Sequence, residues 1–96
     1  MQNHSKSLKI ALIGDCLAGG GAEKVHALLS IYFEKLGHKV SNCVIIDWVA
    51  YEFSGTLFNI GKGDEKNSSF QRKISKFFQL KSFIKSNDFD AVIDFR

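Results

Sequence analysis

Short aliphatic runs alternate along this chain with longer stretches in which apolar residues recur at a helical period. The runs 8–13, 40–47 and 91–96 are rich in aliphatic side chains. Runs of this length and composition are typical of strands buried on both faces of a parallel sheet. A weaker run at 57–60 predicts a further short strand between the second and the last of them.

Two helices are expected between these strands. The first ends at Gly37, a residue type that favours helix C-termini, and His26 is expected at the edge of its buried stripe. The second covers 70–86. The predicted buried faces comprise Ala22, Val25, Leu29, Tyr32, Phe33 and Leu36 in the first helix and Phe70, Ile74, Phe77, Phe78 and Ile84 in the second. Strand, helix and strand in this order form a right-handed βαβ unit with parallel strands, so the sequence predicts an α/β, Rossmann-like parallel sheet with flanking helices.

Composition narrows the class of protein. The 96 residues are enough for one domain, residues 1–96, and 45% of them are hydrophobic. The net charge of +3 is spread along the chain and falls short of the clustered basic face of a nucleic-acid-binding protein, so no nucleic acid is expected as a partner. Cys16, Cys43 and the three histidines show no metal-ligand or disulfide spacing. The chain has neither a signal-peptide core nor an apolar run of about 20 residues, which predicts a cytoplasmic location.

The segment GDCLAGGGAEKV, residues 14–25, contains three consecutive glycines between the first strand and the first helix. Such a loop exposes backbone N–H groups at the positive end of a helix dipole, and both features favour phosphate. A nucleoside-triphosphate P-loop would require lysine and a hydroxyl where Gly20 and Gly21 stand. A dinucleotide fingerprint would require glycine in place of Lys24, with Asp47 as the ribose-binding acid.

A third interpretation is a family resemblance. The string IALIGDCLAGGGAEKVHALLSIYFEKLGHKV resembles the start of a family 4 glycosyltransferase of the GT-B fold. The motif GGGAEKV covers residues 19–25 and the motif GHKV covers residues 37–40, in the order and at the distance typical of that family. YEFSGTLFNIG and NDFDAVIDFR are similar to its third and fourth strand regions, so the resemblance extends from about Lys9 to Arg96.

The resemblance implies the truncated first half of a GT-B N-terminal domain, which faces the acceptor. The implied parent is a retaining glycosyltransferase that moves a sugar from a nucleotide-sugar donor to a saccharide or lipid-linked acceptor, in cell-surface polysaccharide synthesis. The resemblance implies no cofactor, and because many members of the family need no metal, none is expected here. The residues implied to border the donor diphosphate are Gly19, Gly20, Gly21, Ala22 and Glu23, with Asp15 and Lys24 as cleft-facing candidates. For Glu23, a structural role at the positive end of the helix stands beside the binding role.

No catalytic residue is expected within these residues, since the family's glutamate pair and its usual histidine belong to later segments. The chain alone is therefore predicted to be inactive as a transferase. The alternative from another class is a small, non-enzymatic nucleotide- or phosphate-binding module. Basic residues alternate with phenylalanines in 70–86, so peripheral contact of this helix with the inner membrane is a further hypothesis. The simpler interpretation is a helix that packs on the sheet and exposes its basic face to solvent.

Overall fold

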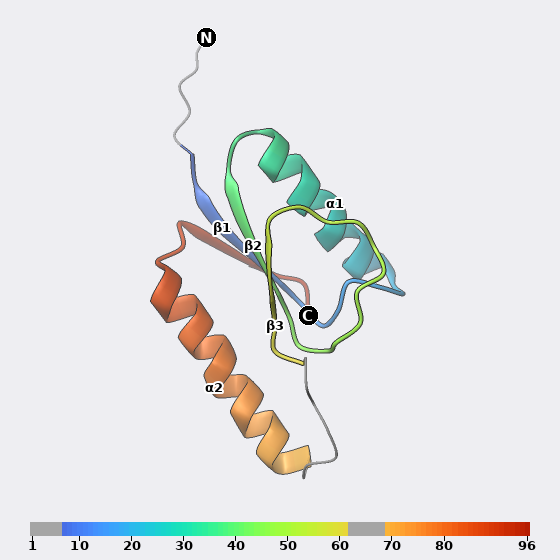
Figure 1. Ribbon diagram of the computed structural model, residues 1–96, viewed down its shortest axis with the longest axis vertical. Coiled ribbons are helices and arrows are strands. Elements are labelled where there is room, and N and C mark those ends of the chain that lie inside the picture. The colour runs from blue at the N-terminus through green and yellow to red at the C-terminus, as the bar shows by residue number, and fades with distance from the viewer. Residues whose placement is uncertain (1–6, 62–68) are drawn as a thin grey trace.

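Four parallel strands and two helices form the part of the chain that the structure describes. The computed structural model describes residues 7–61 and 69–96. Its elements are β1 (Lys9–Gly14), α1 (Gly21–Lys35), β2 (Lys39–Val44), β3 (Thr56–Asn59), α2 (Ser69–Asn87) and β4 (Ala91–Asp94). All strand pairs are parallel, in the order β3-β2-β1-β4. The predicted α/β, Rossmann-like parallel sheet with flanking helices is therefore confirmed (Figure 1).

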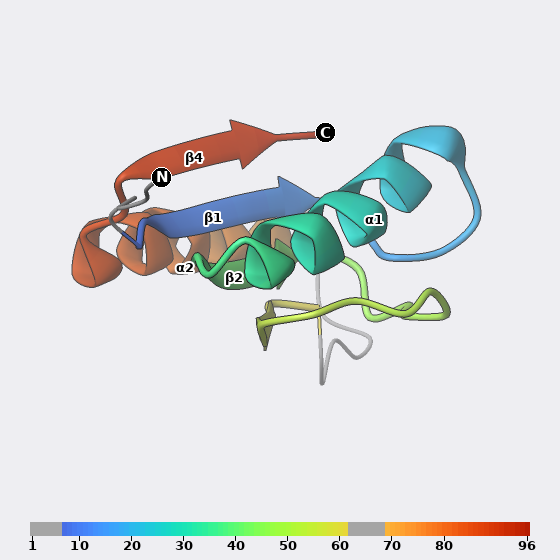
Figure 2. The same cartoon turned by 90° about the horizontal axis from the view of Figure 1, so that it is seen from above.

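The two helices cover opposite faces of the sheet. Side chains alternate along a strand, so Ile10 and Leu12 of β1 pack on the side of α1, while Ala11 and Ile13 pack on the side of α2. The connection through α1 leads from β1 to β2, whereas the connection through α2 leads from β3 across to β4 on the other side of β1. This reversal creates a topological switch point between β1 and β4, which is where open α/β sheets bind ligands. Figure 2 shows the loop before α1 and the C-terminal end at the same edge of the sheet.

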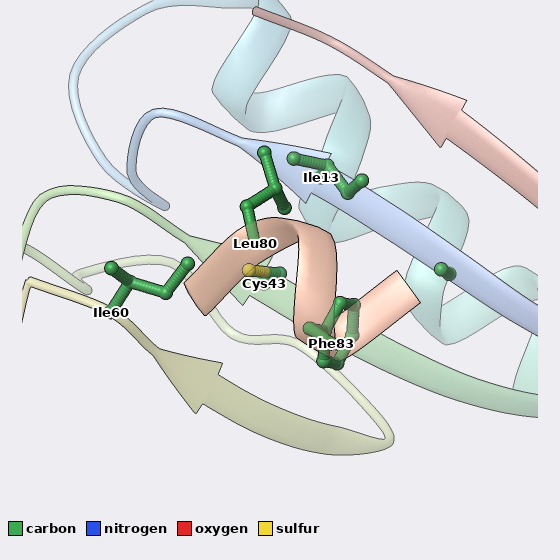
Figure 3. Close-up of a cluster of buried hydrophobic side chains, with 6 residues drawn as sticks. Ile13, Cys43, Ile60, Leu80 and Phe83 are labelled. Carbon is green, nitrogen blue, oxygen red and sulfur yellow. The ribbon is translucent and has the colours of Figure 1, made fainter. Parts of the chain in front are cut away.

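A small cluster of buried side chains forms the core on the α2 face of the sheet. Figure 3 shows Leu80 and Phe83 of α2 packed over Ile13 of β1 and Cys43 of β2, with Ile60 directly after β3. Phe83 also stacks on Phe58, with ring centroids 5.1 Å apart. Burial raises the pKa of the Cys43 thiol to about 12, so this cysteine stays protonated as a core side chain.

The observed strands correct two predictions, one about where β2 ends and one about the burial of β4. β2 ends at Val44 and does not reach Asp47, because the N–H groups of both Ile45 and Ile46 donate to one carbonyl oxygen, that of Asp15, at 3.1 and 2.7 Å. Two donors on one acceptor cannot continue a parallel ladder. The last strand was expected to be buried, but β4 lies at an edge of the sheet and pairs only with β1 among the described strands.

The predicted buried stripe of α1 is wrong in most of its members. The fully buried side chains are His26, Ala27 and Ser30. Leu29 and Phe33 pack partly against the sheet, whereas Ala22, Val25, Tyr32 and Leu36 are exposed. Apolar residues surround more than half of this helix, so their pattern does not select one face. The small side chains of Ala27 and Ser30 allow close approach to the sheet. His26 Nε2 contacts Asn42 of β2, while the Ser30 hydroxyl donates to the Ala27 carbonyl of the same helix and accepts from the Ser54 N–H before β3.

The predicted face of α2 is also shifted. Leu80 and Phe83 are buried and Ile84 is partly buried, whereas Ile74, Phe77 and Phe78 are exposed. The side chain of Phe70 lies outside the described residues. Within the described part of the chain, neither helix combines the length and hydropathy needed to cross a bilayer.

Candidate functional site

The glycine-rich loop occupies the carboxyl edge of the sheet, between the end of β1 and the start of α1 (Figure 2). Leu17 anchors it and is fully buried. The Leu17 N–H donates to the Trp48 carbonyl at 3.0 Å, and the Leu17 carbonyl accepts from Ala50 and Tyr51 at 2.9 Å each. The segment after β2 therefore fixes the middle of the loop, which is buried, whereas Asp15 and the three glycines are exposed.

The three glycines differ in what surrounds them. Gly19 has a φ of +88°, and a Cβ there would lie 3.4 Å from the Trp48 ring. Gly20 is the N-cap of α1 and carries no side-chain cap, and a Cβ on Gly21 would meet nothing within 4 Å. The first hydrogen bond of the helix runs from Lys24 N to Gly20 O at 3.1 Å, so the N–H groups of Gly21, Ala22 and Glu23 have no acceptor within the helix. This end of α1 offers backbone donors and the positive end of the helix dipole to an anion.

Glu23 takes up part of that electrostatic role itself. Its carboxylate folds back over the N-cap, where a Cβ on Gly20 would lie 2.5 Å from Oε1. A carboxylate in the first turn of a helix is stabilised by the dipole. An added phosphate must therefore bind beside Glu23 or displace its flexible side chain.

The other predicted candidates differ in their surroundings. Ala22 is exposed in the first turn of α1. Lys24 places its ammonium 5.6 Å from the centroid of the Tyr51 ring, so its side chain leans away along the 48–52 segment. Asp15 is exposed directly after β1. Asp47, the acid of the dinucleotide interpretation, lies three residues beyond β2 and accepts a hydrogen bond from Asn59 Nδ2 at 2.9 Å.

Arg96 is a residue of the switch point that the sequence interpretation did not single out. Its guanidinium donates through Nε and Nη2 to the Asp94 carboxylate, at 3.0 and 2.8 Å, and holds the pKa of Asp94 below its usual value. The hydrogen bond with Asp94 raises the pKa of Arg96, and the charge of Asp15, across the ends of β1 and β4, adds to this effect. The sequence could have indicated Asp94 and Arg96, because they lie at the carboxyl end of a predicted parallel strand, where folds of this type bind their ligands.

His26 is a second residue that was missed as a feature of the site. It is fully buried beneath the loop, its ring is stacked on Phe95 with centroids 5.1 Å apart, and Nε2 lies 2.9 Å from Asn42 Oδ1. Asn42 Nδ2 donates to the carbonyls of Ser54 and Thr56 at 2.9 and 3.0 Å, so Oδ1 is the acceptor and His26 Nε2 carries the proton. Nδ1 then holds a lone pair without a hydrogen-bond partner, facing Gly14. The sequence does contain a signal for this buried face: His26 and Ser30 are four residues apart, with the small residue Ala27 between them.

The buried His26 predicts an acid-sensitive fold. Burial lowers its pKa from 6.5, while the Asn42 hydrogen bond and the Glu23 charge act in the opposite direction and are weaker. The unfolded chain therefore binds a proton at a higher pH than the folded chain. The free energy of unfolding is expected to be constant near pH 7.5 with respect to this group and to decrease as the pH falls below 6.5. Urea titrations at pH 7.5 and 5.0 measure this decrease.

His26→Gln is the matched control, because glutamine keeps an N–H donor for Asn42 and does not titrate. The difference in unfolding free energy between the two pH values should be smaller in this variant than in the parent chain. Equal differences in both proteins would exclude His26 as the group that titrates.

Among residues 7–61 and 69–96, no three His, Cys, Asp or Glu side chains gather as a metal site. Comparison of the chain with known proteins gives no match to a protein-family model and no match to a curated protein.

Proposed function

We propose that this chain is part of the N-terminal, acceptor-side domain of a retaining glycosyltransferase of the GT-B fold. The proposed enzyme moves a sugar from a nucleotide-sugar donor to a saccharide or lipid-linked acceptor in cell-surface polysaccharide synthesis. Its proposed setting is the cytoplasm, with peripheral contact with the inner membrane through 70–86. The proposal rests on the resemblance of GGGAEKV and GHKV to family 4 glycosyltransferases.

One structural observation supports this proposal above the others. The GGGAEKV motif spans the end of a loop and the first turn of α1, at the carboxyl edge of a parallel sheet, with three N–H groups that have no acceptor within the helix. Donors in this arrangement stabilise negative charge that develops on a leaving diphosphate. The proposed role of Gly19, Gly20 and Gly21 is therefore to border the donor diphosphate, while the nucleoside and most of the sugar bind to residues outside this chain.

The first test is a titration of the isotope-labelled chain with uridine diphosphate, guanosine diphosphate and inorganic pyrophosphate, followed by amide NMR. We expect the amide signals of Gly19–Ala22 to shift with all three compounds, because they share only the diphosphate. The dissociation constants should be similar and weak, about 1 mM, since few groups contribute. Uridine, which carries no phosphate, should leave these signals unchanged.

Gly21→Pro is the sharpest variant for this test. Proline is favoured at the first helical position, and Gly20 is already extended, with φ −104° and ψ −179°, as a residue before proline should be. The substitution therefore removes one N–H donor without disturbing the helix. It should weaken pyrophosphate binding about tenfold, the loss of one charge-assisted hydrogen bond. Glu23→Gln removes the competing carboxylate and should strengthen binding.

Two outcomes would contradict the proposal. Unchanged amide signals at Gly19–Ala22 with every diphosphate would mean that the loop holds no phosphate. Saturable, micromolar binding of one complete nucleotide would favour the alternative of a small, non-enzymatic nucleotide-binding module.

A further inference from the structure

An exposed apolar segment follows β2 at the carboxyl edge of the sheet, beside the glycine-rich loop. We call residues 46–50 the Trp48 ledge, and all five of them are exposed. Ile46 is 50% exposed, Trp48 55% and Val49 37%, although side chains of these types are usually buried. Apolar side chains that gather on one exposed segment indicate a place where another molecule binds.

Hydrogen bonds on both sides of Trp48 hold the ledge in place. The Trp48 N–H donates to the Ile46 carbonyl at 2.8 Å. The Trp48 carbonyl accepts from the Leu17 N–H, and the Leu17 carbonyl in turn accepts from Ala50. The six-membered ring of Trp48 lies against Gly19, where an added Cβ would be 3.4 Å from two of the ring carbons. A ring fixed in this way loses little conformational entropy when a ligand binds to it.

Polar backbone groups of the ledge are open beside this ring. Leu17 and Val49 form a parallel bridge in which both hydrogen bonds use the N–H and C=O of Leu17. The N–H and C=O of Val49 therefore point away from Leu17, and neither makes a hydrogen bond with any residue that the structure describes. A donor and an acceptor side by side match hydroxyl groups, because a hydroxyl both donates and accepts.

The charges around the ledge disfavour an anionic ligand. Among residues 44–61, Asp47 and Glu52 are the only charged side chains, and both are negative. Lys24 of α1 places its ammonium over the ring of Tyr51, directly after the ledge. One ammonium beside two carboxylates leaves no net positive charge here. A neutral ligand therefore fits the ledge better than a phosphate or an anionic lipid headgroup.

We infer that the Trp48 ledge binds a neutral saccharide ring, with one face of the sugar stacked on Trp48 and its hydroxyls bonded to the N–H and C=O of Val49. The C–H bonds of a pyranose form an apolar, weakly positive face, which the negative face of an indole ring attracts. In the proposed enzyme this saccharide is the acceptor. That assignment rests on the proposed function, whereas saccharide binding at the ledge does not.

Trp48 is the only tryptophan of the chain, so tryptophan fluorescence reports on the ledge alone. The probe is methyl β-glucopyranoside, with sorbitol as an open-chain polyol and cyclohexanol as a ring with a single hydroxyl. We expect the glucoside to shift the emission to shorter wavelength with saturation, at a dissociation constant of about 10 mM, because few groups contribute. Sorbitol and cyclohexanol should bind at least about threefold more weakly, since each makes only one of the two kinds of contact. No saturable shift with the glucoside, or equal or tighter binding of cyclohexanol, would overturn the inference.

Substitutions of exposed aromatic residues separate the ledge from unspecific binding. Trp48→Ala should weaken glucoside binding at least about tenfold, followed by the amide signal of Val49, because the stacking surface is lost. Trp48→Phe keeps a smaller ring and should lose only about threefold. Tyr32→Ala is the matched control, because Tyr32 of α1 is also 55% exposed but lies outside the ledge, and its loss should leave binding unchanged. The amide spectrum of each variant checks the fold, and equal losses in Trp48→Ala and Tyr32→Ala would overturn the inference.

The same titrations separate this inference from the proposed function. Pyrophosphate at the glycine loop shifts the amide signals of Gly21 and Ala22, whereas the glucoside shifts those of Trp48 and Val49. A response to the glucoside without one to pyrophosphate contradicts only the proposed donor loop, and the reverse contradicts only this inference. Vesicles of phosphatidylcholine test a lipid surface as the occupant of the ledge. An emission shift with vesicles and none with the glucoside would assign the ledge to a membrane and overturn the inference.

Discussion

Substitution of Gly55 by alanine is expected to lower the midpoint of thermal unfolding by about 15 °C. Gly55 has a φ of +95°, a conformation that costs an alanine roughly 1–2 kcal/mol. A Cβ at this position would also fall inside contact distance of the Val40 carbonyl oxygen, and only 3.0 Å from its carbon. Since the obstacle is backbone of β2, it cannot rotate away, and overpacking adds about 1–3 kcal/mol. A total of about 3 kcal/mol shifts the midpoint of a domain of this size by that amount.

Gly37→Ala is the matched control for this prediction. Gly37 follows α1 with a φ of +94°, almost the same as that of Gly55, but a Cβ there would meet nothing within 4 Å. Its substitution should cost only the conformational part, about 1 kcal/mol. Calorimetry of both variants then separates strain from collision. Equal shifts in the two proteins would show that β2 and the turn before β3 can move apart at little cost.

The order and type of the elements could be predicted because they depend on local pattern. Aliphatic runs bounded by glycine or polar residues placed β1, β3 and β4 within a residue or two of their observed bounds. The end of β2 could not be predicted in this way. It depends on two N–H groups that share the carbonyl of Asp15, thirty residues earlier in the chain.

The buried faces of the helices could not be read from periodicity. Val25, Leu28, Tyr32 and Leu36 are as apolar as core residues, yet they are about half exposed. The buried face instead includes His26, because Asn42 of β2 supplies a partner for its ring. Periodicity measures how apolar a face is, but not which polar groups will find partners on a distant strand.

The candidate site could be predicted only in part from the sequence. A glycine-rich loop after a buried strand falls at the carboxyl edge of a parallel sheet from sequence alone, and it does so here. Arg96 lies beside that loop only because β4 pairs with β1, and this follows from the strand order and not from any motif. Whether these residues bind a nucleotide-sugar stays a prediction.

The largest loss of stability is expected from Asn42→Leu. Asn42 is fully buried in β2, and its amide joins three segments. Leucine has a similar volume, but it leaves the His26 Nε2–H group and the carbonyls of Ser54 and Thr56 without their partner. The buried His26 N–H costs about 1–3 kcal/mol when it loses its hydrogen bond, and the two carbonyls, which are only partly buried, cost less each, so the sum is about 4 kcal/mol. Urea unfolding followed by circular dichroism should show a much lower midpoint, or no folded baseline at all, because a domain of this size is stable by only about 5–14 kcal/mol.

Asn59→Leu is the control for a strand asparagine whose loss should be tolerated. Asn59 of β3 makes one exposed hydrogen bond to Asp47, and its buried Oδ1 has no partner to lose. Its substitution should change the unfolding free energy by less than about 1 kcal/mol. A loss as large as that of Asn42→Leu would mean that position in the sheet, and not hydrogen bonding, determines the effect.

A double-mutant cycle isolates the contact between α1 and β2. His26→Leu removes the N–H group that Asn42→Leu leaves without an acceptor. The double variant should therefore lose less unfolding free energy than the sum of the losses in the two single variants. The two carbonyls of Ser54 and Thr56 remain unpaired in the double variant, so stability should recover only in part. The interaction free energy should be about 1 kcal/mol or more, as for other buried pairs in direct contact. Strict additivity would mean that the 2.9 Å contact between His26 Nε2 and Asn42 Oδ1 contributes nothing, and that α1 is held on the sheet by its apolar contacts alone.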